Sequence, residues 1–581
     1  MKLLVWVAVI AVIIPSVLAQ SGTIKLLALA EDSSGISFGA VADLDLRIEP
    51  GKNRVYLETV PLTKITTQIS MRFAQQIACK ELDIDCSDKD FYFTIRALPG
   101  IVGGPSAGST ASVLSASLIA GLELRNDTAI TGTINSGGII GPVGGLKEKI
   151  TAAAKAGITR VLIPMGTANS TDSETNKTTD LVEYGNLLGI EVIEVSTILE
   201  ALEEYTGRNF TRVPANLTIE PDYQETMKSV AGVLCNRTGQ IRESLERHRG
   251  DANTTMLEEE ALNMSARAKA AFGNSQYYAS ASFCFRSNVG YKQAWALQRR
   301  WAKNDIERAL AELNKRIADY SAAIDSRNIS SITDLQTYMV VKERLLEAKN
   351  LLADTGGNGT AENIAYAEER LYSAKIWARF FDSNDAKYSV SIPSLRDSCA
   401  AKISEAEERI NYVRSFLPDA LDDARAELDR AYKDLASGNY TLCLYKASKS
   451  KAQSDVILSV IGVEAARVDD LIDLKREIAK EAIARSQQKG IFPIIGYSYY
   501  EYSGSLKEMD KYSALLFAEY ALEFSNLDIY FPKTNSKTTT LWQRIEPHFL
   551  WIIAGAILGI IISMFAEALQ DAIGQMGRKK R

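Results

Sequence analysis

The sequence predicts an α+β domain over residues 22–206, an all-α region over residues 222–530 and one transmembrane helix over residues 549–568. Three patterns predict this architecture. In the first part, short alternating or apolar runs are interleaved with segments of helical spacing. In the second part nearly every segment has the helical period, and the third part is an apolar run about long enough to span a bilayer. A chain of 581 residues is also longer than one core usually organises, roughly 250–300 residues.

The α+β domain is predicted from the changing period of its apolar residues. Strands are expected over residues 24–30, 40–48, 91–98, 129–135, 161–164 and 189–195. Helices are expected over residues 65–82, 104–124 and 146–156, with a short last helix through residue 203. A Gly-rich turn region (residues 136–145) and a polar loop (residues 168–180) complete the domain.

Residues 207–221 contain prolines and two Asn-x-Ser/Thr sequons, which is typical of a linker. Amphipathic helices are then expected over residues 299–323, 334–353, 362–381, 395–417 and 456–484. A Gly/Tyr-rich loop is expected over residues 490–504. Tyrosines recur before Ala-rich helices, so the region is either an irregular bundle or a set of degenerate helical repeats.

The N-terminus has the pattern of a secretory signal peptide. Residues 1–19 combine a basic Lys2, an apolar core and a small-residue cleavage site at Val17-Leu18-Ala19. The apolar run is near the upper length of a signal peptide, so an uncleaved anchor is the alternative. Either reading predicts that the body of the protein is exported.

The C-terminus has the pattern of a membrane anchor. Residues 531–548 form a polar juxtamembrane linker, and the apolar run of residues 549–568 follows. The basic tail of residues 569–581 should stay in the cytoplasm, because positive charge is retained on that side. We therefore expect a single-pass cell-membrane protein with its body outside. Gly555 and Gly559 have the spacing that lets membrane helices pack closely, which leaves a homo-oligomer open.

Cysteines and sequons agree with export. Six cysteines suggest disulfides, and pairing in sequence order would join Cys79 to Cys86, Cys235 to Cys284 and Cys399 to Cys443. Buried free thiols are the alternative. Numerous Asn-x-Ser/Thr sequons indicate a glycosylated exterior.

Composition excludes several functions. The net charge of -6 and the scattered basic residues provide no basic stripe for nucleic acid. Neither cysteine nor histidine spacing indicates a metal site, so no metal or cofactor is expected. The two histidines, His248 and His548, are far in sequence from any candidate nucleophile, which disfavours a Ser-His-Asp triad.

One lysine has the position of a general base. In the helix of residues 146–156, Leu146, Ile150 and Ala153 share one face, and Lys149 lies at its edge. The other charged side chains of this helix point away: Lys147, Glu148 and Lys155. Burial lowers a lysine's pKa, as a general base near neutral pH requires. The alternative is a lysine whose stem packs while its ammonium reaches water.

One serine has the position of a nucleophile. Ser106 lies in Gly103-Gly104-Pro105-Ser106-Ala107-Gly108, at the predicted start of a helix. Backbone N–H groups at a helix N-terminus can stabilise an oxyanion, and the glycines let a peptide approach the backbone closely. The alternative is that Ser106 only caps the helix.

Together these segments resemble a known family. Gly104-Pro105-Ser106-Ala107-Gly108, Thr131-Gly132 and Gly144-Gly145-Leu146-Lys147-Glu148-Lys149 resemble, in order and spacing, the proteolytic domain of Lon proteases. The resemblance covers residues 22–206 and implies the α+β Lon-type fold. It implies that Ser106 is the nucleophile, Lys149 the general base and Thr131 the residue that orients the lysine amine. Gly104, Pro105 and Gly108 would support the site.

The chain departs from the Lon pattern in two places. Val102-Gly103 stands where Lon enzymes usually have Lys-Asp, which puts the electrostatics and regulation of the site in doubt. The sequence also contains no Gly-x-x-x-x-Gly-Lys-Ser/Thr phosphate loop, so no ATPase module is expected. The whole layout resembles the membrane-anchored, ATP-independent Lon-like serine proteases of archaea.

The sequence thus predicts an extracytoplasmic serine endopeptidase with a Ser-Lys dyad and with unfolded or flexible polypeptides as substrates. The alternative is a non-catalytic surface protein that uses the Lon-like fold as a scaffold. The joint presence of Ser106, Lys149 and Thr131 favours the enzyme.

Overall fold

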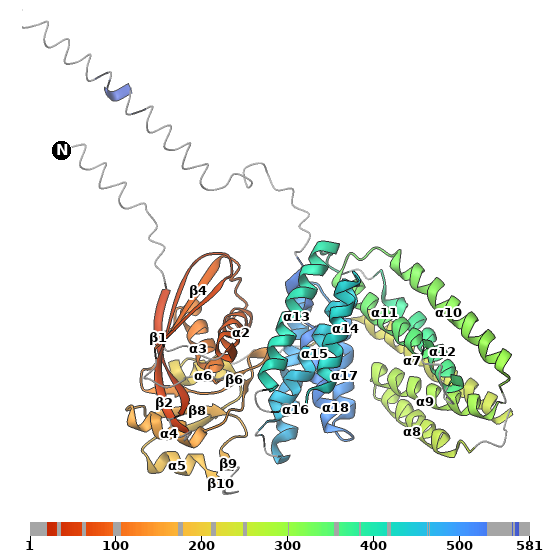
Figure 1. Ribbon diagram of the computed structural model, residues 1–581, viewed down its shortest axis with the longest axis horizontal. Coiled ribbons are helices and arrows are strands. Elements are labelled where there is room, and N and C mark those ends of the chain that lie inside the picture. Colours follow the sequence, from red (N-terminus) through yellow and green to blue (C-terminus); the bar gives the residue numbers. More distant parts are fainter. Residues whose placement is uncertain are drawn as a thin grey trace, which may run out of the picture. The chain divides into compact units, whose positions relative to one another are not determined.

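The computed structural model shows an α/β part followed by many helices (Figure 1). It describes residues 20–31, 37–60, 65–96, 106–171, 178–210, 217–247, 253–299, 301–353, 360–382, 385–414, 417, 420–461, 463, 465–531, 561, 564–566 and 568. Residues Met1–Pro532 form one compact unit and Lys533–Arg581 form a second. The α/β part and the helices after it both belong to the first unit.

The α/β part is built on a seven-stranded mixed sheet of order β11-β8-β5-β1-β2-β4-β3. The strands are β1 (Gln20–Glu31), β2 (Ser37–Pro50), β3 (Val55–Val60), β4 (Lys89–Arg96), β5 (Thr128–Ile130), β8 (Arg160–Pro164) and β11 (Glu191–Val195). β1 and β2 form a long antiparallel pair in which Gln20 lies opposite Ile48. On the other side of β1, the strands β5, β8 and β11 are all parallel to it.

Helices cover both faces of this sheet: α2 (Ile65–Glu81), α3 (Ala107–Ala120), α4 (Leu146–Lys155), α5 (Leu181–Leu187) and α6 (Ile198–Thr206). Successive residues of a strand point to opposite faces. Leu26 accordingly packs with α2, α3 and α6 in one apolar core, and Leu27 packs with α4 and α5 in another. The two cores hold α3 and α4, which carry the candidate catalytic residues, against opposite faces of the same sheet.

Most elements of this part occur where the sequence predicts them, and the exceptions have physical reasons. The expected strand over residues 129–135 is two strands, because the chain leaves the sheet at Thr131-Gly132. Its second half, β6 (Thr133–Ile134), pairs with β7 (Ile140–Gly141) around the short 3-10 turn η1 (Ser136–Gly138). The expected loop over residues 168–180 contains the paired strands β9 (Asn169–Thr171) and β10 (Thr178–Asp180). The strand β3 and the helix α5 have no counterpart among the predicted elements.

The rest of the first unit is helical (Figure 1). Its helices are α7 (Pro221–Arg247), α8 (Thr255–Gly273), α9 (Tyr277–Gln298), α10 (Lys303–Asp325), α11 (Ile332–Ala353), α12 (Thr360–Trp377), α13 (Ile392–Arg414), α14 (Asp422–Ala436), α15 (Tyr440–Val460), α16 (Val468–Gln488), α17 (Ile494–Leu506) and α18 (Lys511–Phe524). The short 3-10 turns η2 (Ala378–Phe380), η3 (Ala465–Arg467) and η4 (Leu527–Tyr530) accompany them.

Two predictions for this region are wrong. The single helix expected over residues 456–484 is interrupted between α15 and α16, because Ile461 is extended with φ -63° and ψ 120°. The loop expected over residues 490–504 is largely the helix α17. Close packing requires a glycine in this helix, because a Cβ on Gly496 would lie 2.2 Å from Ser525 Oγ. Tyr497 and Tyr502 are buried and hold the helix in the core.

The disulfide pairing in sequence order is confirmed. Cys79 is joined to Cys86, Cys235 to Cys284 and Cys399 to Cys443, with Cα–Cα distances of 6.1, 5.1 and 5.6 Å. The first bridge closes the end of α2, and the other two join α7 to α9 and α13 to α15.

In the part of the chain that the structure describes, no helix has both the length and the apolar character needed to cross a membrane. Of the predicted span over residues 549–568, only residues 561, 564–566 and 568 are described. The predicted signal segment, residues 1–19, lies outside the described residues, and so do residues 211–216 of the predicted linker between α6 and α7.

Candidate active site

Ser106 lies immediately before the first residue of α3 and is partly exposed. Its backbone is already helical, with φ -63° and ψ -12°, and its side chain makes no capping hydrogen bond to the helix. The capping interpretation of this serine is therefore wrong. The hydroxyl does not cap the N-terminus of α3. The first N–H groups of a helix have no intrahelical carbonyl to bind.

Lys149 lies in the first turns of α4 and is only 2% exposed. The prediction that this lysine alone faces inward is confirmed, since Lys147 and Lys155 are exposed. A lysine whose ammonium reaches water is thereby excluded. Burial lowers the pKa of Lys149 to about 7, with Glu148 opposing the shift. About half of these amines are consequently neutral near pH 7.

Thr131 is the hydrogen-bond partner of the Lys149 amine. Lys149 Nζ donates a hydrogen bond to Thr131 Oγ1 over 3.1 Å, and the threonine is fully buried. The backbone of Thr131 is fixed in turn, because its N–H donates to the carbonyl of Leu162 in β8 at 3.1 Å. The chain just after β5, bonded to the neighbouring interior strand β8, therefore holds the hydroxyl that binds the amine.

The residue after Thr131 holds the serine. The N–H of Gly132 donates to the carbonyl of Ser106 at 3.3 Å, and the N–H of Ser109 donates to the carbonyl of Gly132 at 3.1 Å. The two-residue segment Thr131-Gly132 thus contacts Ser106 through its backbone and Lys149 through a side chain. It brings together residues that are 43 positions apart in the sequence.

Two glycines are required by this packing. A Cβ on Gly132 would lie 2.4 Å from Ile140 Cγ2, so no larger residue fits where α3 meets β6 and β7. Gly145 precedes α4 with φ +67°, and a Cβ there would lie 2.4 Å from Leu29 Cδ1. Its carbonyl accepts the Lys149 N–H at 3.0 Å. Gly145 therefore sets where α4 begins and how Lys149 enters the interior.

Of the other predicted site residues, Gly108 lies in the first turn of α3, against Ile134. Gly104 and Pro105 lie outside the described residues, and so do Val102-Gly103, His248 and His548. The contribution of Gly132 was not predicted as such. Its signal was its place directly after Thr131, at the point where a strand pattern contains a glycine.

Comparison with known proteins finds a family whose domain covers these residues. Residues 48–203 match the family model of the Lon protease (S16) C-terminal proteolytic domain. The chain is 44% identical to the Lon protease of Methylocella silvestris over 81 residues, which are 14% of this chain and 10% of the relative. It is 38% identical to that of Paraburkholderia phytofirmans over 120 residues, which are 20% of this chain and 15% of the relative. The identity to the Lon protease of Syntrophomonas wolfei is 36% over 134 residues, which are 22% of this chain and 16% of the relative.

The fold, the site and these likenesses define the class of a serine peptidase. The chain carries a Lon-type C-terminal proteolytic domain. It spans only 10–16% of the length of these three curated relatives, so the likeness concerns this domain alone. The matched residues begin at 48, after β1 and nearly all of β2, although β1 supplies a central strand of the sheet.

Proposed function

We propose that this protein is a membrane-anchored, extracytoplasmic and ATP-independent serine endopeptidase that uses a Ser106–Lys149 dyad. The observation that carries the proposal is a fully enclosed lysine amine, with a pKa of about 7, bound to a threonine whose neighbour binds the serine. The Lon-type domain supports the reaction class. Polypeptide bonds are the substrate that this class implies.

The dyad would act in two half-reactions, each with two proton transfers through Lys149. The neutral Lys149 amine accepts the proton of Ser106 Oγ as the oxygen attacks the scissile carbonyl. The resulting ammonium then donates the proton to the departing amine, and an acyl-enzyme is left. In the second half, Lys149 takes a proton from water as the water attacks the acyl group, and it returns that proton to Ser106 Oγ as the bond between the serine oxygen and the acyl carbon breaks. Thr131 keeps the amine oriented in both halves.

The start of α3 would stabilise the negative charge on the carbonyl oxygen. The helix begins at Ala107, and the N–H groups of a first turn lack intrahelical partners. One of them, on Ser109, is used to bind Gly132. Those of Ala107 and Gly108 lie beside the nucleophile, where the helix dipole favours an anion.

The location and the independence from ATP are the further parts of the proposal. They are supported by the signal-like residues 1–19, the apolar run of residues 549–568, the basic tail and the absence of a phosphate-loop motif in the sequence. Three disulfides also suit an oxidising compartment. Without an unfolding motor, substrates should be unfolded or flexible segments, in a layout like that of membrane-anchored Lon-like proteases of archaea.

The test is cleavage of unfolded casein by the full-length chain, purified in a mild detergent, without ATP. The wild type should cleave casein, whereas Ser106→Ala and Lys149→Ala should not. Cleavage that persists in Ser106→Ala would overturn the assignment of the nucleophile. No cleavage by the wild type, at any pH between 6 and about 9, would favour a non-catalytic scaffold.

A further inference from the structure

The segment that follows Thr131 is held by the helical region as well as by the sheet. Ile139, next to η1, packs with Ile478 of α16 and Leu522 of α18 in one apolar cluster. Gly137 has φ +73°, and a Cβ there would lie 2.3 Å from Ile478 Cγ2. The turn therefore approaches α16 as closely as a glycine allows.

Arg409 makes a direct polar contact between α13 (Ile392–Arg414) and this segment. Its side chain is buried, and its Nη1 donates to the carbonyl of Ile134 in β6 over 2.9 Å. Its Cζ lies 4.0 Å from the centroid of the Phe73 ring in α2. Its Nε lies 2.7 Å from Asp455 Oδ1 in α15. One guanidinium thus joins two helices of the bundle to β6.

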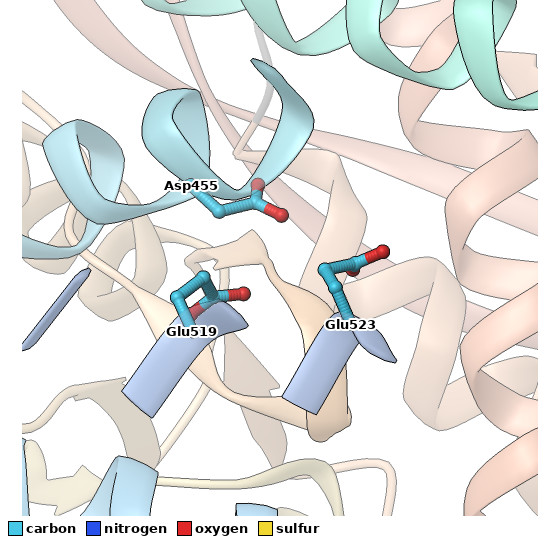
Figure 2. A group of neighbouring side chains, drawn as sticks. All are labelled: Asp455, Glu519 and Glu523. Atoms are coloured by element: carbon cyan, nitrogen blue, oxygen red, sulfur yellow. The ribbon is translucent and has the colours of Figure 1, made fainter. Parts of the chain in front are cut away.

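The orientation of Arg409 is fixed by a group of buried charges. Figure 2 shows the carboxylates of Asp455, Glu519 and Glu523, which come from α15 and α18 and lie near one another. Each already has a basic partner. The pairs are Arg409 and Lys451 with Asp455, Lys402 and Lys451 with Glu523, and Lys475 with Glu519. The group therefore anchors side chains of the protein itself, Arg409 among them.

Ile134 connects Arg409 to the candidate dyad. Its side chain packs against Gly108 in the first turn of α3, where a Cβ would lie 2.9 Å from Ile134 Cγ2. Gly132, two residues earlier, binds the carbonyl of Ser106, and Thr131 binds the amine of Lys149. Residues 131–134 hence contact both members of the dyad and the helical region.

We infer that Arg409 is a positioning residue through which the helical region keeps the Ser106–Lys149 site assembled. By holding the Ile134 carbonyl, it fixes β6 and the Thr131-Gly132 segment before it. The inference rests on the proposed function and deepens it, because it gives the helices a task in the activity of the peptidase. Loosening this contact should slow the chemical step more than it weakens substrate binding.

The experiment compares Arg409→Met with the matched variant Arg237→Met in the full-length chain. Arg237 also stacks on an aromatic ring, Tyr372, at 4.2 Å and pairs with a buried carboxylate, Glu369, but in helices α7 and α12. Casein cleavage is measured as kcat, KM and their pH profile, together with the melting temperature. Gly137→Ala disturbs the packing of η1 against α16 from the side of the peptidase domain, and the same kinetic and melting measurements are made on it.

We expect Arg409→Met to lower kcat about tenfold or more, with KM within about twofold and a displaced pH profile. Arg237→Met should lower the melting temperature by a similar amount and leave kcat unchanged. Equal kcat values in the two variants would overturn the inference. If Arg409→Met does not melt cooperatively, Gly137→Ala decides: a lowered kcat supports the inference, and an unchanged kcat overturns it. A wild type that does not cleave casein would instead refute the proposed function.

Discussion

Three buried lysines, one in the α/β part and two in the helical region, differ in the group that binds the amine. Lys149 in the α/β part is 2% exposed and binds a neutral hydroxyl. Lys402 and Lys451 in the helical region are each 4% exposed and bind the carboxylate of Glu523. Burial opposes the charge in all three, but carboxylates outweigh it and raise the pKa of Lys402 and of Lys451.

The difference shows what lowers the pKa of a buried lysine, as a general base requires. Within the described part of the chain, Glu148 is the charged group that acts on the pKa of Lys149, and it does not restore the usual value. Lys402 and Lys451, whose pKa values are raised, remain ammonium groups that hold helices together. Among these three lysines, the direction of the pKa shift therefore follows from whether a carboxylate binds the amine.

The largest expected effect separates activity from stability at Lys149. Lys149→Met should reduce kcat/KM by at least about 10³-fold, because the general base is lost. The same variant should be more stable than the wild type by up to about 5 kcal/mol near pH 7, because folding no longer has to bury an amine that is protonated in the unfolded chain.

The pH dependence of that gain follows from the pKa of Lys149, which is about 7 in the folded state and 10.5 as the ordinary value. Between these values the unfolded chain binds one proton more, so the wild type gains stability as the pH rises. The stability advantage of Lys149→Met should therefore be full below about pH 7 and vanish above about pH 10.5. Urea unfolding at several pH values measures it, and a pH-independent difference would contradict a buried neutral amine.

Removal of a paired lysine should have the opposite effect on stability. Lys475 and Glu519 are both fully buried and form an ion pair between α16 and α18. Lys475→Met leaves the carboxylate without its partner and should destabilise the protein by about 3–5 kcal/mol. Urea unfolding followed by tryptophan fluorescence is a suitable measurement, since Trp295, Trp301 and Trp377 lie in the helical region. The double variant Lys475→Met/Glu519→Gln should recover most of the loss, and no recovery would argue against the pair.

The smallest effect comes from giving Lys149 the carboxylate that it lacks. Thr131→Asp places an acid beside the amine, which should raise the pKa of Lys149 from about 7 by about 2 units. Activity at pH 7 should then fall about 50-fold as the neutral fraction falls, and it should return towards pH 9. Thr131→Asn is the matched control, since it keeps an acceptor oxygen without a charge. A pH–activity profile that is the same for both variants would contradict the comparison.

Local patterns predicted much of the fold and of the site. Periodicity located the strands and helices around Ser106 and Lys149 and selected Lys149 as the inward-facing lysine of α4. It failed where packing replaces local preference. α17 is a helix despite its glycines, because Gly496 lies against Ser525 and buried tyrosines hold it. The break between α15 and α16 was not predicted, because the apolar residues keep the helical spacing across it.

The sequence by itself determined the choice of Ser106 and Lys149 as candidate catalytic residues, because a serine at a helix start and a lysine on an apolar face follow from spacing along the chain. Only the tertiary structure decided what each of them meets. The hydroxyl of Thr131 reaches Lys149 from 18 positions away, and Arg409 reaches Ile134 from 275 positions away. A periodic pattern records the face on which a side chain lies but not the partner across it. The pKa of Lys149 and the hold on β6 depend on those partners.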